Sequence, residues 1–282
     1  MPVRYLTLSA PHETLTHAAI ADIGLTPRDA QWLTPQTAAI FTLQSDHEKV
    51  VLPHLNDAPF DWCMTNEHPK PKALFLADMD STMIEIECID ELADYAGVKA
   101  EVSEITEKAM RGDLDFRQAL AARVALLEGL STSVLEDCYR ERVRFSDGAK
   151  AAVQTMARNG CRCVLVSGGF TFFTHRVAEA LGFHRHRANE LGTYKGVLTG
   201  KVIPPISDAA TKVETLQSEQ NALHIGASDI IAVGDGANDI PMIEAAGLGI
   251  AYRAKPKTRA AARASIDHSD LSALLHFQGL AT

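Results

Sequence analysis

The chain has 282 residues, of which 46% are hydrophobic and 22% are charged, and its formal net charge is −9 at pH 7. Its length allows one large or two smaller domains, and its composition is ordinary for a soluble globular protein. The negative net charge argues against a general nucleic-acid binder, so an anionic substrate would require cations placed locally.

The sequence lacks the usual signs of export or membrane insertion. Its first residues do not have the basic and then apolar layout of a signal peptide, and no apolar run approaches the length of a membrane span. The five cysteines show neither a zinc-binding spacing nor an even number suited to disulfides. We therefore expect a cytoplasmic protein with reduced thiols, without a membrane or nucleic-acid partner. A homodimer is compatible with the sequence.

Residues 1 to about 65 alternate between strand and helix patterns. The apolar periodicity predicts six elements in the order strand, helix, strand, strand, helix, strand: residues 3–9, 13–23, 30–33, 38–43, 47–55 and 60–64. This order is typical of the ferredoxin-like fold, and it resembles the small-molecule-sensing ACT fold in element order only. A polar segment with two prolines follows at 66–72. The sequence therefore predicts an N-terminal domain with its linker over residues 1–70.

A strand followed by two carboxylates lies at residues 73–82. Its first five residues form an unbroken apolar run, which is typical of a strand buried on both faces of a parallel sheet. Asp78 and Asp80 then stand at the carboxyl end of this strand, where open α/β sheets bind ligands. Two neighbouring anions favour a hard divalent cation or an electrophilic phosphorus. Taken alone, this segment is equally consistent with a helix-capping turn, or with the metal-binding motif of a sugar-nucleotide transferase.

The pattern then becomes helical until about residue 143. Four helices are predicted from apolar periodicity, terminal glycines and a capping serine: residues 87–95, 101–111, 116–127 and 131–141. Because this helical group follows the first strand directly, we expect it to form a cap over the strand ends, at about residues 88–143.

The α/β alternation resumes after this insert. Helices are expected at 149–158, 172–181, 210–222 and 241–246, strands at 161–166, 229–233 and 248–251, and a hairpin at 194–202. Residues 71–282 are therefore predicted to form a second domain of the α/β class with a parallel sheet.

Two further strands end in polar turns that contain glycine. Ser167 and Gly168 offer a hydroxyl and backbone N–H groups at the start of a helix, which is a natural seat for phosphate. Asp235 offers another carboxylate for a cation, with Asp239 behind it. Lys212 lies in the first turn of a predicted helix, where a cation opposes the helix dipole, and this misfit is weak evidence for a functional role.

The chain resembles the phosphatases of the haloacid dehalogenase superfamily in four segments, in this order: Asp-Met-Asp-Ser-Thr at 78–82, Val-Ser-Gly-Gly-Phe at 166–170, Lys212, and Gly-Asp-Gly-Ala-Asn-Asp at 234–239. The resemblance covers about residues 73–270, and the four motifs together are highly specific. It implies a Rossmann-like core with a parallel sheet and a helical cap inserted after the first catalytic strand.

The resemblance also implies roles for individual residues. Asp78 is expected to attack phosphorus and become an aspartyl phosphate, while Asp80 protonates the leaving oxygen and later activates water. Mg²⁺ is expected to be held by the Asp78 carboxylate, the Asp80 backbone carbonyl and the Asp235 carboxylate, with support from Asp239. The implied substrate-binding residues are Glu87, Arg123, Ser167, Gly168, Lys212 and Asn238.

Within the superfamily, the helical insert resembles that of enzymes acting on O-phospho-L-serine. The similarity lies in three places: residues 85–92, residues 107–110 and Arg123-Val124. It implies that Glu87 meets the ammonium group of the substrate and Arg123 its carboxylate, with Met110 and Phe116 as apolar contacts from the cap. The expected activity is Mg²⁺-dependent hydrolysis of O-phospho-L-serine to L-serine and phosphate, the last step of serine synthesis in that group.

Two alternatives stay open on the sequence alone. One is a relative that acts on another small phosphomonoester, such as phosphothreonine or phosphohomoserine, because pocket shape rejects one extra methyl group poorly. The other is a binding module that senses an amino acid through residues 1–65 and has lost catalysis. The intact set of Asp78, Asp80, Lys212 and Asp235 argues against the binding module.

Overall fold

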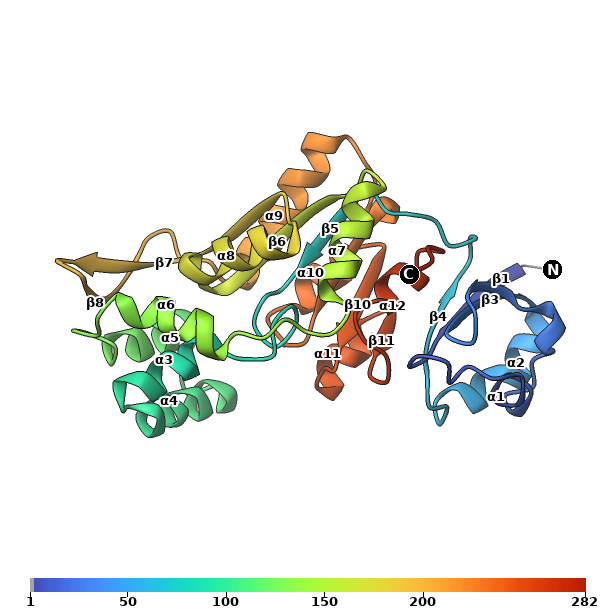
Figure 1. The fold of residues 1–282 in the computed structure, drawn as a ribbon, viewed down its shortest axis with the longest axis horizontal. Helices are drawn as coiled ribbons and strands as arrows, with labels where there is room; N and C mark the ends of the chain where they lie inside the picture. The colour runs from blue at the N-terminus through green and yellow to red at the C-terminus, as the bar shows by residue number, and fades with distance from the viewer. Residues whose placement is uncertain (1–2) are drawn as a thin grey trace.

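A computed structural model describes residues 3–282, apart from the side chains of Ser45 and Met110. Figure 1 shows three parts along the long axis of the molecule: a helical group at one end, a central sheet covered by helices, and a smaller sheet with its helices at the other end. The two end parts therefore contact different regions of the central sheet and its loops.

The N-terminal part is an antiparallel sheet of four strands in the order β2-β3-β1-β4. Its elements are β1 (Val3–Ser9), α1 (His17–Asp22), β2 (Gln31–Thr34), β3 (Ala38–Gln44), α2 (Ser45–Leu55) and β4 (Asp61–Thr65), with a 3₁₀ turn at Pro27–Asp29. This is the predicted order of elements, and a separate hydrophobic cluster fills the space between sheet and helices. The likeness to the ACT fold and the domain boundary near residue 70 stay predictions.

The central sheet has seven strands in the order β11-β10-β9-β5-β6-β7-β8. Their bounds are β5 (Leu74–Ala77), β6 (Arg162–Phe170), β7 (Arg185–Tyr194), β8 (Val197–Ile203), β9 (Ile230–Gly234), β10 (Leu248–Tyr252) and β11 (Ala264–Ile266). All neighbours are parallel except the β7–β8 hairpin. Every residue of β5 is buried, which explains its unbroken apolar sequence and confirms the predicted α/β class.

The helices form two groups. Those between β5 and β6 are α3 (Cys88–Ala96), α4 (Lys99–Arg111), α5 (Phe116–Ala125), α6 (Ser133–Arg142) and α7 (Ala149–Arg158). The later ones are α8 (Thr171–Leu181), α9 (Ala209–Leu223), α10 (Ile240–Ala245), α11 (Pro256–Ala261) and α12 (Ala273–His276), with a 3₁₀ turn at Ala227–Asp229. Helices α3 to α6 form the predicted insert. One continuous hydrophobic cluster joins this cap to the core sheet.

The N-terminal sheet joins the core through buried polar contacts. The carboxylate of Asp61, which is 3% exposed, accepts hydrogen bonds from the backbone N–H groups of Asp267, His268 and Ser269, the shortest at 2.7 Å. The hydroxyl of Ser9 lies 2.8 Å from Nδ1 of His276, which is fully buried. We call this set of contacts the junction.

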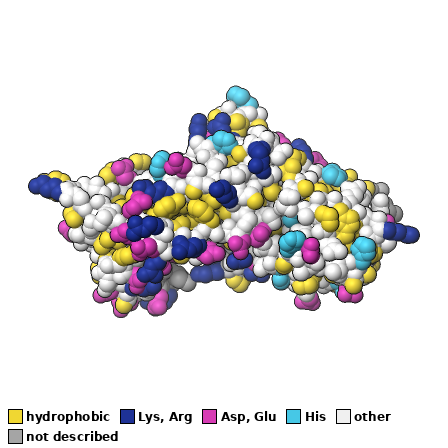
Figure 2. Space-filling view, viewed as in Figure 1, with side chains coloured by type: hydrophobic (Ala, Val, Ile, Leu, Met, Phe, Trp, Pro, Cys, Tyr) yellow, Lys and Arg dark blue, Asp and Glu magenta, His cyan; other side chains and the backbone are white. Residues whose placement is uncertain are grey.

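The surface shows no single concentration of charge on the face drawn in Figure 2, where basic and acidic side chains are interspersed over the cap and the core. On this face, the mixture differs from the basic stripe typical of nucleic-acid-binding surfaces. Among residues 3–282, no helix combines the length and apolarity needed to cross a membrane.

Candidate active site

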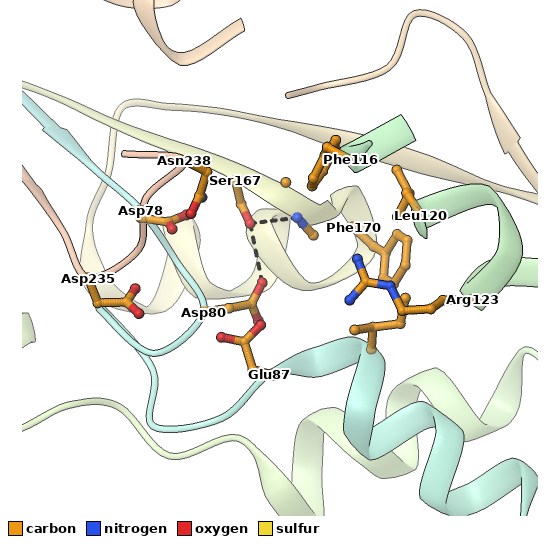
Figure 3. A pocket seen from close by; sticks show the side chains of 13 residues that line it. Asp78, Asp80, Glu87, Phe116, Leu120, Arg123, Ser167, Phe170, Asp235 and Asn238 are labelled. Atoms are coloured by element: carbon orange, nitrogen blue, oxygen red, sulfur yellow. Dashed lines mark hydrogen bonds between the residues drawn. The ribbon is translucent and has the colours of Figure 1, made fainter. Parts of the chain in front are cut away.

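Three strand ends meet at a cavity of about 200 Å³ beneath the cap. The loops after β5 and β9 and the end of β6 form its floor, and the cap forms its other wall. Its lining residues are Asp78, Asp80, Glu87, Ile89, Phe116, Leu120, Arg123, Ser167, Gly168, Gly169, Phe170, Asp235 and Asn238. Figure 3 shows Asp78, Asp235 and Asn238 on one side of this cavity and Phe116, Leu120 and Arg123 on the other.

Asp78 is held at the end of β5 by the sheet itself. Its backbone N–H donates to the carbonyl of Val233 in β9 at 3.0 Å, so it still belongs to the parallel ladder. Its Oδ1 accepts from the backbone N–H of Met79 at 2.8 Å and from Nζ of Lys212 at 2.8 Å. A carboxylate fixed at one oxygen in this way has a defined orientation, which a nucleophile requires.

Lys212 is the buried cation of the site. It is 1% exposed and lies between Asp78 and Asp239, 2.5 Å from Oδ1 of Asp239. Burial would lower the pKa of the Lys212 amine, but the two carboxylates outweigh burial and raise this pKa above its ordinary value. The first turn of α9 carries Lys212, and the capping box of Asp208 and Thr211 begins that helix. Lys212 is unfavourably placed relative to the dipole of α9, and its ion pairs with Asp78 and Asp239 compensate for this position.

Asp80 is set apart from Asp78 by its partners. Its Oδ1 accepts from the backbone N–H of Cys88 at 3.1 Å, and its Oδ2 accepts from the hydroxyl of Ser167 at 3.3 Å. Burial raises the pKa of Asp80 to about 6, although the hydrogen bond from Cys88 opposes this rise. A carboxyl group with such a pKa can both give and take a proton near neutral pH. A side chain at Gly169 would collide with Asp80, because its Cβ would lie 2.5 Å from Oδ2.

The Ser167-Gly168 segment differs from its prediction. It belongs to the last residues of β6, and α8 begins only at Thr171, so these residues do not open a helix. Their backbone is instead shaped by Asn189 and Ser207. The Asn189 amide donates to the Gly168 carbonyl at 2.8 Å, and the Ser207 hydroxyl donates to the Ser167 carbonyl at 2.9 Å. Sequence reasoning missed this pair, which is buried and fixes the chain at the cavity wall.

Asp78, Asp235 and Asp239 form an acidic cluster in which one oxygen of each lies within 4.8 Å of the others. Thr82 holds Asp235 by donating its hydroxyl to Oδ1 at 3.0 Å. Burial, followed by the charge of Asp78, raises the pKa of Asp235 to about 6 and that of Asp239 to about 7. Uncompensated negative charge among oxygen ligands fits a bound divalent cation.

Asp239 has a different position from the other two acids of this cluster. It is fully buried, its Oδ1 accepts from Lys212 and its Oδ2 accepts from the backbone N–H of Gly236 at 3.0 Å. Both oxygens are therefore already engaged by the protein, and the predicted support of the cation site by Asp239 stays a prediction. The carboxylate of Asp80 lies outside the cluster and is bonded to Cys88 and Ser167, and a role of its backbone carbonyl as a cation ligand stays a prediction.

The cap brings the predicted recognition residues to the same cavity. Glu87 precedes α3, and its Oε1 accepts from the hydroxyl of Ser81 at 2.6 Å. Arg123 projects from α5 with Nε 3.4 Å from the carbonyl of Ala119. Phe116 packs against Gly168 across the cavity. The side chain of Met110, also predicted as an apolar contact, lies outside the described residues.

The order of the strands, the position of the cap and the acidic cluster are features of one class of hydrolases, in which a cap covers the strand ends of a parallel sheet. The chain matches the family described as haloacid dehalogenase-like hydrolase over residues 75–244, and it belongs to this family. This confirms the superfamily inferred from the four motifs.

Several named proteins are similar to this chain. The phosphoserine phosphatase of Polaromonas sp. is 46% identical over 207 residues, which are 72% of this chain and 88% of that protein. A HAD family hydrolase from Salmonella enterica serovar Typhi superposes with a TM-score of 0.85 at 28% identity, over 98% of both chains. A phosphoserine phosphatase solved as a phospho-aspartyl intermediate analogue gives a TM-score of 0.68 at 39% identity, covering 74% of this chain and 99% of that one.

Proposed function

We propose that the protein is a phosphatase that hydrolyses O-phospho-L-serine to L-serine and phosphate. The observation that carries this proposal is one small cavity with two unlike ends. Asp78, Asp80 and Ser167 face it from the sheet, Glu87 lies beside Asp80 on the connector before α3, and Arg123 faces it from the cap. A phosphate ester group suits the first end, and the ammonium and carboxylate groups of an amino acid suit the second.

The chemistry follows from the two carboxylates of the β5 loop. The Asp78 carboxylate attacks phosphorus, an aspartyl phosphate forms, and the bond from phosphorus to the serine oxygen breaks. Asp80 gives its proton to that leaving oxygen and then, as a carboxylate, takes a proton from the water that hydrolyses the intermediate. The pKa of about 6 suits Asp80 to both roles. A relative solved as a phospho-aspartyl intermediate analogue supports the covalent route.

Asp78 and Asp235 would hold Mg²⁺ by their carboxylates, together with the backbone carbonyl of Asp80 and with Asp239 behind them. A cation held there would neutralise charge on the phosphoryl oxygens, which otherwise repel an anionic nucleophile. Lys212 adds a second positive charge from within the protein, 2.8 Å from Asp78. Ser167, Gly168 and Asn238 complete the wall around the phosphate.

The cavity volume supports a small substrate, and the cysteines support a reducing compartment. A cavity of about 200 Å³ suits a single small metabolite, and the cap encloses it. Phosphothreonine is the second candidate because its additional methyl group changes affinity by only about 10–200-fold in a hydrophobic pocket. Five buried, unbonded cysteines fit a reducing compartment such as the cytoplasm.

The test is phosphate release from O-phospho-L-serine, O-phospho-L-threonine, phenyl phosphate and two sugar phosphates, each with Mg²⁺ present. We expect the highest kcat/KM for O-phospho-L-serine. A preference for a sugar phosphate, or equal rates for all esters, would contradict the assignment of Glu87 and Arg123 to an amino-acid group.

A further inference from the structure

Ser81 adopts a backbone conformation that its residue type does not favour. It lies between Asp80 and Thr82 with φ of 55°, in the left-handed region. Residues with a Cβ are uncommon in this region, and glycine or asparagine is the usual occupant. A serine that stays there must gain something from its side chain or from its surroundings.

The surroundings of Ser81 show what its side chain does. Its hydroxyl donates to Oε1 of Glu87 at 2.6 Å, and its backbone N–H donates to the carbonyl of Ile86 at 3.2 Å. Side chain and backbone thus tie the same short segment, the connector that leads into the cap. Other atoms of this turn secure it as well, since the N–H groups of Met83 and Ile84 donate to the Met79 carbonyl.

The neighbouring hydroxyl holds a different carboxylate. Thr82 donates to the carboxylate of Asp235 at 3.0 Å, on the side of the acidic cluster. Two consecutive hydroxyls therefore hold two different carboxylates, and the left-handed turn at Ser81 separates their directions. One of these carboxylates belongs to the proposed cation site and the other to the proposed amino-acid site.

We propose that Ser81 is a positioning residue for substrate specificity, which fixes Glu87 so that its carboxylate receives the ammonium group of the substrate. This inference rests on the proposed function. A single donated hydrogen bond holds Oε1 and leaves Oε2 for the ligand, and it removes rotamer freedom that binding would otherwise have to restrict. Ser81 itself does not touch the reacting atoms.

The test compares Ser81→Gly, Ser81→Ala and Ser81→Asn on O-phospho-L-serine and on phenyl phosphate, which has no ammonium group. Glycine tolerates the left-handed backbone conformation but has no hydroxyl, and alanine neither favours this conformation nor has a donor. Asparagine tolerates the conformation and has a side-chain N–H donor. We expect Gly and Ala to raise KM for O-phospho-L-serine about tenfold and to change phenyl phosphate turnover less than twofold, while Asn recovers part of the loss. Thr82→Val is the matched control and should lower activity on both esters.

Two measurements separate the possible failures. In the double variant Ser81→Ala with Glu87→Gln, the loss should be no larger than in Glu87→Gln alone; additive losses would overturn the proposal. Equal losses on both esters, or a Ser81→Gly variant as selective as wild type, would overturn it too.

A crystal structure of Ser81→Ala should show Glu87 in altered or multiple rotamers, and an unchanged Glu87 would contradict the proposal. Wild-type protein inactive on O-phospho-L-serine would refute the proposed function, while the crystal structure would still report on Ser81.

Discussion

The active site and the junction both bury carboxylates, but they compensate the charge in opposite ways. In the active site, four acids lie close together, and the one buried cation, Lys212, pairs with only two of them, Asp78 and Asp239. At the junction, Asp61 stands alone among backbone N–H groups that all point at its two oxygens. The first arrangement leaves negative charge uncompensated, and the second leaves almost none.

This difference distinguishes carboxylates suited to catalysis from a carboxylate that stabilises the fold. Buried acids with raised pKa values are costly to the fold, because burial disfavours their charged form. Such acids are typical of sites where a bound ligand neutralises part of their negative charge. A carboxylate saturated by backbone donors is satisfied without a ligand, and its contribution is to hold two parts of the chain together. The two sites should therefore respond differently to the same kind of substitution.

The largest expected effect is at the nucleophile. Asp78→Asn keeps the shape of the side chain and removes the charge that attacks phosphorus, so we expect kcat to fall at least about 10⁴-fold while the fold survives. Rapid quenching of wild type with labelled O-phospho-L-serine, followed by peptide mapping, should place the label on Asp78. A label on another residue would refute the assignment.

Removal of the metal should act almost as strongly. A chelator is expected to abolish turnover, and added Mg²⁺ to restore it, because the acidic cluster alone repels a phosphate dianion. Asp235→Ala should lose the same activity and not be rescued by Mg²⁺. Full turnover in excess chelator would mean that the cluster has a purely structural role.

The junction should lose stability rather than activity. Asp61→Ala leaves the backbone N–H groups of Asp267, His268 and Ser269 without their buried acceptor, so we expect a loss of about 3 kcal/mol in unfolding free energy. Denaturant titration measures this loss, and kcat per folded molecule at low denaturant should stay near that of wild type. A large fall in kcat would show that the junction also shapes the active site.

Local patterns in the sequence predicted the β-α-β-β-α-β order, the buried β5 strand and the helical cap. Family resemblance, rather than a local pattern, brought Glu87 and Arg123 to the list of site residues, and both line the cavity. The predicted hairpin at 194–202 was wrong in extent, because β7 runs over Arg185–Tyr194 and the predicted range covers mainly β8; α11, β11 and α12, which have three to six residues each, were missed. Such short elements carry too little periodicity to be recognised.

Contacts made by single polar residues could not be predicted at all. Asn189 with Ser207, and Asp61 with the loop before α12, pair across 18 and more than 200 residues of sequence. Their partners are backbone groups, which every residue possesses, so no pattern of residue types marks them. The pairing of Lys212 with Asp239 was missed for a different reason: both are side chains, but they lie 27 residues apart in sequence and no local pattern relates them.

Recognition of the substrate should show a smaller effect than the chemistry. If Arg123 binds the substrate carboxylate as proposed, Arg123→Ala removes a charge-assisted hydrogen bond worth roughly 1.5–3 kcal/mol, so kcat/KM for O-phospho-L-serine should fall by about one to two decades. Phenyl phosphate should be nearly unaffected. Arg123→Lys should recover only part of the loss, since a point charge cannot form the planar two-pronged contact. Equal losses on both esters would assign Arg123 to cap closure instead.

The smallest effect expected concerns His276, the buried histidine of the junction. Burial lowers the pKa of His276 to about 4 from an ordinary value of 6.5, against the opposing charge of Asp270. Because the folded pKa lies below the unfolded one, protons favour unfolding. Its contribution to stability is complete above pH 6.5 and is lost as the pH falls toward 4. Between pH 7 and 5 this amounts to about 2 kcal/mol.

The carboxyl groups of the active site act in the opposite direction, since their raised folded pKa values mean that the fold gains stability as they take up protons. The unfolding free energy of wild type alone therefore mixes the two sites. His276→Asn keeps a polar partner for Ser9 but does not titrate, so the difference between wild type and variant isolates the junction. We expect wild type to lose about 2 kcal/mol more than His276→Asn between pH 7 and 5. Parallel stability curves would mean that His276 is not buried in its neutral form, and that the junction opens in solution.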